Sequence, residues 1–150
     1  NLYRNIEWPV VVMLAAMIPV GQALETSGIS LNIANFISAS TDGLALPWLI
    51  LMVLVITMFV SDIVNNAATA VIMAPIAANL AFQVGQPVEP FLMAVAVGAS
   101  CAFLSPIGHQ CNTLVMAPGN YKFGDYWRLG LPLECVIVAI SIPMILFVWT

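Results

Sequence analysis

The residues best suited to chemistry form a polar island in an apolar chain, Ser61-Asp62-Ile63-Val64-Asn65-Asn66-Ala67-Ala68-Thr69. This island carries one carboxylate and two adjacent amides between the apolar runs 44–60 and 70–82. An amide oxygen can ligate a hard cation while the amide nitrogen donates to an anion, so Asn65 and Asn66 suit a sodium and oxyanion site. Polar groups at such a depth are costly. We therefore interpret the island as one wall of an ion and substrate site.

A second polar interruption lies further along the chain, Leu104-Ser105-Pro106-Ile107-Gly108-His109-Gln110-Cys111-Asn112-Thr113. Its proline and glycine leave backbone groups without helical partners. A bilayer tolerates this only where the segment lines a cavity or is buried in protein. Asn112 and Thr113 open a half-helix here, as Asn66 does in the first island. Such broken helices are typical of secondary transporters, and we expect the two segments to face each other.

Several of these residues also have a purely structural interpretation. A single asparagine at a helix start is usually a cap, but two adjacent ones beside a carboxylate favour a site. Asp62 could ligate sodium, carry a proton, or pin the neighbouring loop by accepting a hydrogen bond. His109 is either a proton relay or, more commonly for a lone loop histidine, an ordinary hydrogen-bonded residue.

The composition predicts an all-α integral membrane protein. Of the residues, 62% are hydrophobic and 7% charged, in continuous apolar runs rather than the alternating pattern of a membrane barrel. The net charge of −4 rests on few charged residues, which excludes nucleic acid as a partner. The three cysteines lack the close spacing of zinc or redox sites and predict buried free thiols. The start at Asn1, with no leader, predicts a fragment of a longer chain.

The predicted elements place the two polar segments on a hairpin and on a broken helix. We predict a transmembrane helix over 8–28, an interfacial helix over 29–41, a re-entrant helical hairpin over 44–84 with its tip at 61–66, a broken transmembrane helix over 88–118 with its break at 104–112, and a transmembrane helix over 127–150. The first hairpin limb, from Pro47 to Val60, gives roughly 21 Å of helix against a hydrocarbon core of about 30 Å. On limb length alone, the hairpin stops inside the membrane.

The few cations predict the orientation of a multi-pass protein in the cell membrane. One crossing before the hairpin and one through the broken helix put Arg4 on the same side as Lys122 and Arg128. The positive-inside bias makes that side cytoplasmic. The hairpin mouth then opens on the outer side.

The motifs together resemble the C-terminal half of the divalent anion:sodium symporter family, within the larger ion transporter superfamily. The resemblance rests on the tip Ser61-Asp62-x-x-Asn65-Asn66-Ala67, the run 68–76, and Ser105-Pro106-Ile107-Gly108-x-Gln110-x-Asn112 followed by Pro118-Gly119-x-Tyr121. It implies transport of sulfate or dicarboxylates by an inverted-repeat carrier, of which residues 1–150 are the second repeat.

The resemblance also assigns roles to individual residues. The family tip reads Ser-Asn-Thr where this chain has Asn65-Asn66-Ala67, so Asn66 carries over as a contact. The lost hydroxyl at Ala67 makes sulfate or another inorganic oxyanion at least as suitable as a dicarboxylate. The predicted substrate contacts are Asn65, Asn66, Thr69, Asn112 and Thr113. The predicted sodium ligands are Ser61, Asp62, Val64, Asn66, Gly108, Gln110 and Asn112.

We therefore expect sodium-coupled symport by alternating access, with no catalytic residue and no cofactor or metal beyond the coupling ion Na⁺. The expected partners are the anion, the bilayer and the missing first repeat, with a homodimer left open. Proton coupling, a cation/proton antiporter or a metalloid efflux protein of the same fold are alternatives, and in an antiporter Asp62 would carry the proton. A structural or sensory membrane subunit remains open, although unbroken helices would suffice for it. An intramembrane enzyme is disfavoured because no second mid-membrane acid is expected near Asp62.

Overall fold

Helices form the secondary structure of this chain, which a computed structural model describes over residues 8–40 and 43–149. In chain order they are α1 (Trp8–Thr26), α2 (Ile29–Ser40), α3 (Leu46–Ile63), α4 (Asn66–Gln83), α5 (Glu89–Ala99), α6 (Gln110–Met116), the 3₁₀ helix η2 (Phe123–Asp125) and α7 (Tyr126–Trp149). The described residues contain no strand, which confirms the predicted all-α class. Residues 46–63 and 123–149 form helices long and apolar enough to cross a membrane.

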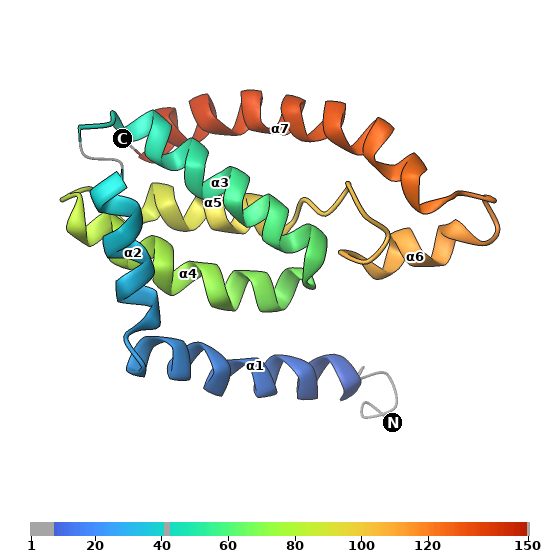
Figure 1. The fold of residues 1–150 in the computed structure, drawn as a ribbon, viewed down its shortest axis with the longest axis horizontal. Helices are drawn as coiled ribbons and strands as arrows, with labels where there is room; N and C mark the ends of the chain where they lie inside the picture. The colour runs from blue at the N-terminus through green and yellow to red at the C-terminus, as the bar shows by residue number, and fades with distance from the viewer. Residues whose placement is uncertain (1–7, 41–42, 150) are drawn as a thin grey trace.

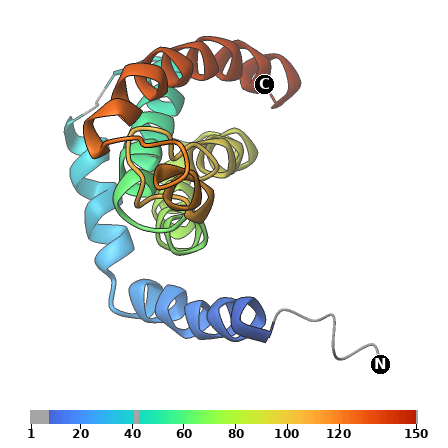
Figure 2. The ribbon, with the colours of Figure 1, turned by 90° about the vertical axis from the view of Figure 1, so that its right-hand side faces the viewer.

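The helices are arranged around a central group of three, α3, α4 and α5 (Figure 1). Helix α7 lies along α3 and α5 on one side of this group, and α1 lies along α4 on the other. Helix α2 runs across the direction of the other helices and joins α1 to the central group. Seen end-on, α7, α2 and α1 curve around α3, α4 and α5 in the shape of a C (Figure 2).

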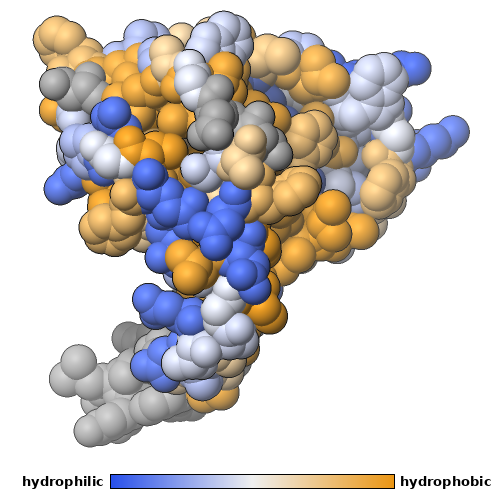
Figure 3. All heavy atoms as spheres, turned by 60° about the vertical axis from the view of Figure 1, so that its left-hand side comes forward, coloured by the Kyte–Doolittle hydropathy of each residue, from blue (hydrophilic) through white to orange (hydrophobic). Residues whose placement is uncertain are grey.

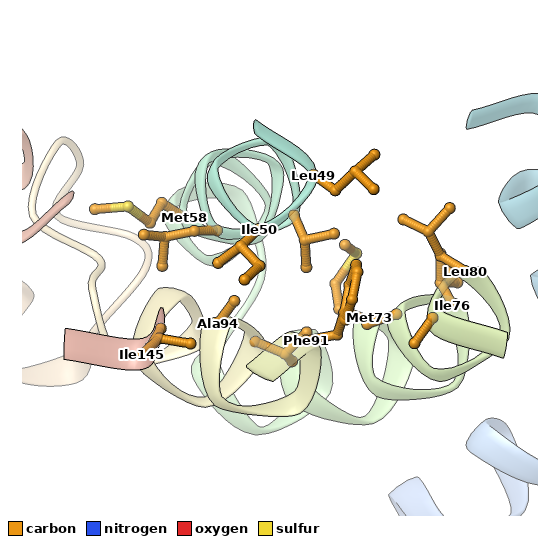
Figure 4. Packing of buried hydrophobic residues seen from close by; sticks show 14 of the residues in the cluster. Leu49, Ile50, Met58, Met73, Ile76, Leu80, Phe91, Ala94 and Ile145 are labelled. Carbon is orange, nitrogen blue, oxygen red and sulfur yellow. The ribbon is translucent and has the colours of Figure 1, made fainter. Parts of the chain in front are cut away.

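The core is apolar and lies mainly between α3, α4 and α5, with Ala34 of α2, Cys101 and Ile145 of α7 added to it. Figure 4 shows Leu49 and Ile50 of α3 facing Phe91 of α5 and Leu80 of α4. Helix α5 approaches α3 closely at Gly98, where an added Cβ would lie 2.9 Å from the Leu54 carbonyl oxygen. Small residues at such a crossing let two membrane helices pack backbone to backbone.

Apolar side chains also cover much of the outer surface. In the view of Figure 3, hydrophilic side chains form a band across a face that is otherwise mostly apolar. Helix α7 exposes large side chains along its length, among them Leu129, Val136 and Phe147. An apolar exterior of this kind is what a helix in contact with lipid or with further membrane helices requires.

The hairpin limbs are longer than the sequence indicated. Helix α3 does not end at Val60 but continues through Ser61 and Asp62 to Ile63, so the turn comprises only residues 64 and 65 instead of 61–66. The helix can include these polar residues because the neighbouring break in the chain provides partners for them. Each limb has 18 residues, or roughly 27 Å of helix. Limb length alone therefore does not separate a re-entrant hairpin from two full crossings.

The break in the fourth predicted segment is also displaced. Helix α5 ends at Ala99, so the non-helical stretch covers residues 100–109 rather than 104–112, and α6 begins at Gln110. Figure 1 shows the turn between α3 and α4 beside this break, while α6 and the start of α7 extend beyond it. The two interruptions of the helical backbone thus lie at the same level of the molecule.

The close approach of α3 and α5 makes Gly98 a sensitive position. We expect Gly98→Val to cost about 1–3 kcal/mol of stability, because the new side chain must displace the Leu54 carbonyl or Thr57. The melting temperature of the purified full-length protein in detergent would report this. Gly124→Val is the matched control, since a Cβ at Gly124 meets nothing within 4 Å. Equal melting temperatures for the two variants would contradict the prediction.

Candidate functional site

The turn of the hairpin consists of two extended residues that close off one helix and open the next. Val64 ends α3, with its N–H donating to the Val60 carbonyl at 2.8 Å. Asn65 caps α4, because its side-chain oxygen accepts the N–H of Ala68 at 2.8 Å. The capping interpretation of Asn65 is therefore confirmed. Its side chain is exposed, which leaves a second role open to it.

Behind the turn, Ser61 and Asn66 meet the end of α5. The hydroxyl of Ser61 donates to the Ala99 carbonyl at 2.9 Å. The amide end of Asn66 faces three oxygens, those of Ser61 Oγ at 2.9 Å and of the Ala99 and Gly108 carbonyls at 3.2 Å each. Because the two carbonyls can only accept, the amide nitrogen is the end that points toward them and donates. Oxygens from α3, α5 and the break thus converge on one side-chain amide.

Gly108 brings the break into direct contact with the hairpin. A Cβ on Gly108 would lie 2.6 Å from the Ser61 carbonyl oxygen and 2.7 Å from the Ala102 side chain. Since real side chains do not approach so closely, only glycine allows this contact without a shift of the backbone. The predicted proximity of the two polar segments is borne out by these distances.

Asp62 acts as a pin between α3 and the break. Its Oδ1 accepts the N–H of Leu104 at 3.0 Å, and its backbone carbonyl accepts the Ser105 hydroxyl at 2.5 Å. The residue is only 6% exposed, and its other carboxylate oxygen has no partner among the described residues. Of the three roles predicted for Asp62, the structure supports the pin directly. The hydrogen bonds of the pin leave Oδ2 of Asp62 without a role.

The side chains of the break hold the loop in shape. The Ser105 hydroxyl accepts the N–H groups of Ile107 and Gly108 at 3.2 Å each. The amide nitrogen of Asn112 donates to the Ala102 carbonyl at 2.8 Å and the Ser105 carbonyl at 3.1 Å. The Thr113 hydroxyl donates to the Pro106 carbonyl at 2.6 Å. Asn112 and Thr113 therefore serve the loop itself, which satisfies the backbone groups that the broken helix leaves open.

Three further predicted residues lie around this site. Thr69 is fully buried in α4, and its hydroxyl has no partner among the described residues, so a substrate could reach it only after the hairpin moved. Gln110 begins α6, and its side chain lies outside the described part of the chain. His109 caps α6 by accepting the Cys111 N–H at 3.1 Å, which confirms the ordinary loop interpretation.

The sequence reasoning missed two contributors. The first is the Ala99 carbonyl, because α5 ends earlier than predicted. The second is Glu134 of α7, whose carboxylate lies beside the Phe103 backbone N–H and within electrostatic reach of Asp62, and one of its oxygens has no partner among the described residues. The expectation that no second acid lies near Asp62 is therefore wrong. The sequence contained a sign of Glu134, because it is the single carboxylate in the apolar run 129–149. An ionisable residue in such a run is a candidate functional residue by default.

A cavity of about 270 Å³ opens beside the break, between α6 and α7. Apolar side chains such as Phe103, Val115 and Leu133 line much of it, and its charged group is the carboxylate of Asp125. Tyr126 closes one wall and donates to the Asn112 carbonyl at 2.7 Å. A wall with a carboxylate and no cation among its lining residues disfavours an anion in this cavity.

An apolar helical protein in which two helix interruptions meet and gather backbone carbonyls has the architecture of a membrane transporter. Comparison with known proteins agrees. The chain matches the CitMHS citrate transporter family over residues 1–98 and 47–150, and these overlapping matches together span it. The chain therefore belongs to the citrate transporter family.

Individual relatives give the same class. The chain is 38% identical to an uncharacterized transporter of Synechocystis, over 97% of this chain and 24% of that protein. It is 33% identical to a probable sodium/sulfate cotransporter of Chlamydomonas reinhardtii, over 92% of this chain and 16% of that protein. It is 31% identical to a sodium-dependent high-affinity dicarboxylate transporter of Caenorhabditis elegans, over 93% and 25%. These names confirm the resemblance to the divalent anion:sodium symporters. The chain spans a quarter or less of the length of these relatives.

The pin formed by Asp62 can be tested without any transport assay. We expect Asp62→Ala to speed hydrogen exchange at the Leu104 amide by about tenfold or more, because that N–H loses its acceptor. Asp62→Asn should stay near the wild type, since the amide oxygen can still accept. Exchange would be followed by mass spectrometry on the full-length protein. Glu89→Ala removes an exposed carboxylate and is the matched control. A Leu104 amide as well protected in Asp62→Ala as in the wild type would refute the pin.

Proposed function

We propose that this chain is the second half of the transport domain of a sodium-coupled symporter for a divalent anion or oxyanion. The observation that carries the proposal is the set of oxygens around the Asn66 amide. Ser61 Oγ and the Ala99 and Gly108 carbonyls all face this amide at 2.9–3.2 Å. These oxygens can either accept hydrogen bonds from the amide nitrogen or coordinate a cation.

A sodium ion would be coordinated by these oxygens. If the Asn66 amide turned its oxygen inward, that oxygen, Ser61 Oγ and the two carbonyls would provide four neutral oxygen ligands for a hard cation. The Val64 carbonyl, at the end of α3, is a fifth candidate. When the Asn66 oxygen turns inward to bind sodium, the Asn66 nitrogen turns outward. Sodium binding would thereby provide a hydrogen-bond donor for the anion.

The anion would bind on the outer side of this cluster, at the start of α4. Asn65 is exposed there, and the outward Asn66 nitrogen and the helix dipole favour a negative charge. Asn112 and Thr113 are proposed to contribute from the break, although both donate to loop carbonyls in this state. The chain covers only part of the length of its relatives, so the remaining contacts would come from the first repeat. With alanine at position 67, sulfate is at least as suitable as a dicarboxylate.

The re-entrant hairpin and the orientation belong to the same proposal. Two observations support them. The hairpin turn lies beside the break while α6 extends beyond it, and the starts of α1 and α7 lie at the same end of the molecule (Figure 1). The second observation fits Lys122 and Arg128 on the cytoplasmic side. Arg4, which precedes α1, lies outside the described residues.

The sodium ligand set predicts the effect of Asn66→Ala. Without the amide oxygen, we expect the sodium concentration for half-maximal uptake to rise about tenfold or more. Uptake of labelled sulfate and labelled succinate by the full-length protein in proteoliposomes, with and without sodium, would measure this. Asn32→Ala, at an exposed position of α2, is the control. Unchanged sodium dependence in Asn66→Ala would rule out the assigned ligand, and wild-type uptake of both anions without sodium would rule out symport.

A proton-coupled antiporter is the second candidate, and the unpartnered oxygen of Asp62 favours it. Asp62→Asn distinguishes the two. It should abolish proton movement in an antiporter, as followed by a pH-sensitive dye inside the proteoliposomes. Under the symport proposal, Asp62→Asn keeps the contact to Leu104 but removes the negative charge next to the proposed ligand Ser61, so it should mainly weaken sodium dependence.

A further inference from the structure

The α5–α6 break lies between acidic residues on two different helices. Asp62 of α3 accepts the Leu104 N–H at 3.0 Å, and the carboxylate of Glu134 of α7 lies beside the N–H of the preceding residue, Phe103. If α5 had continued, these two N–H groups would have had helical carbonyls as acceptors. The break removes those acceptors, and a carboxylate lies at each N–H in their place. Glu134 takes no part in the proposed binding of sodium or anion, and its role is therefore unassigned.

The same face of α7 carries a second adaptation to the break. Gly130 lies four residues before Glu134 and so on the same side of the helix. It is buried, and an added Cβ would collide with the Phe103 carbonyl oxygen and lie 2.7 Å from its carbonyl carbon. Gly130 thus lets the α7 backbone touch the Phe103 peptide, and the Glu134 carboxylate lies beside the N–H of the same residue.

From this geometry we propose that Glu134 is a positioning residue, which accepts the Phe103 N–H and with Gly130 fixes the break to α7, so that the Gly108 carbonyl stays beside the Asn66 amide. The connection to Gly108 is short. Leu104, pinned by Asp62, adjoins Ser105, whose hydroxyl accepts the Gly108 N–H at 3.2 Å. The effect on the break follows from the contacts alone, whereas the effect on sodium rests on the proposed function.

Cys101 provides a measurement of this role that does not need transport. Its thiol lies in the break, two residues before Phe103, and is 5% exposed. Cys111 and Cys135 are exposed, so the prediction of buried thiols is correct for Cys101 and wrong for the other two. A break released from α7 would expose the Cys101 thiol to alkylation by N-ethylmaleimide. We expect Glu134→Ala to speed alkylation of Cys101 by about tenfold or more in the full-length protein, read by mass spectrometry of the Cys101 peptide. Glu134→Gln keeps an oxygen acceptor for Phe103 and should stay within about threefold of the wild type.

Uptake in proteoliposomes gives the second readout. Glu134→Ala should raise the sodium concentration for half-maximal uptake about tenfold, with a smaller change in the maximal rate at saturating sodium. Glu134→Gln should restore the wild-type value. Val136→Ala, at a position of α7 that is 53% exposed, is the control for both readouts. If Glu134→Ala does not reach the membrane, Gly130→Ala takes its place, because its methyl group must push Phe103 away while Glu134 is intact.

The outcomes separate this inference from the proposed function. Protected Cys101 in Glu134→Ala, or in Gly130→Ala where the first variant does not fold, would overturn the positioning role. Equally fast alkylation in Glu134→Gln and Glu134→Ala would overturn the hydrogen bond to Phe103 as its cause. A third outcome is possible, in which Cys101 is alkylated faster in Glu134→Ala alone while uptake by the wild type does not depend on sodium. That outcome would support the attachment of the break to α7 and would refute sodium symport.

Discussion

Backbone amides and carbonyls that leave a helix inside an apolar environment must find new partners, because no water is available to them. Two such interruptions meet in the described part of the chain, the turn between α3 and α4 and the break between α5 and α6. Each interruption provides partners for the other. Asp62 and Ser61 of the hairpin bind Leu104 and Ala99 of the broken helix, and Ser105 returns a bond to the Asp62 carbonyl. The rest of the site follows from this exchange.

Close backbone contact is the geometric condition for the exchange. Gly98 lets α5 run against α3, Gly108 lets the break touch the Ser61 carbonyl, and Gly130 lets α7 reach Phe103. Each glycine gives up side-chain packing at its position. In return, the break is held between α3 and α7, and carbonyl oxygens from distant parts of the chain converge on one asparagine. A membrane transporter that moves ions needs such convergence without many charged groups, which are costly to bury.

The sequence anticipated much of this arrangement. Two polar segments in apolar surroundings predicted the tip of a hairpin and the break of a helix, with Asn66 in the first segment and Gly108 in the second among the predicted ligands. Other predicted site residues form hydrogen bonds to nearby backbone groups, which the sequence pattern did not indicate. Asn112 and Thr113 donate to carbonyls of their own loop, and Asn65 caps α4. Residue type alone does not distinguish a side chain that binds a ligand from one that satisfies its own backbone, because both need the same donors and acceptors.

By itself, the sequence determined the helical membrane class and the approximate places where the helices break, since both follow from runs of apolar residues and from proline, glycine and polar residues. Only the tertiary structure decided where each helix ends. Ser61 and Asp62 remain helical, and α5 stops at Ala99, because partners on other helices compensate the polar groups. It also decided that α7 reaches the break, where Gly130 meets the Phe103 peptide, 27 residues away in the chain. Such contacts depend on how α7 packs against the break, which no local pattern of residues records.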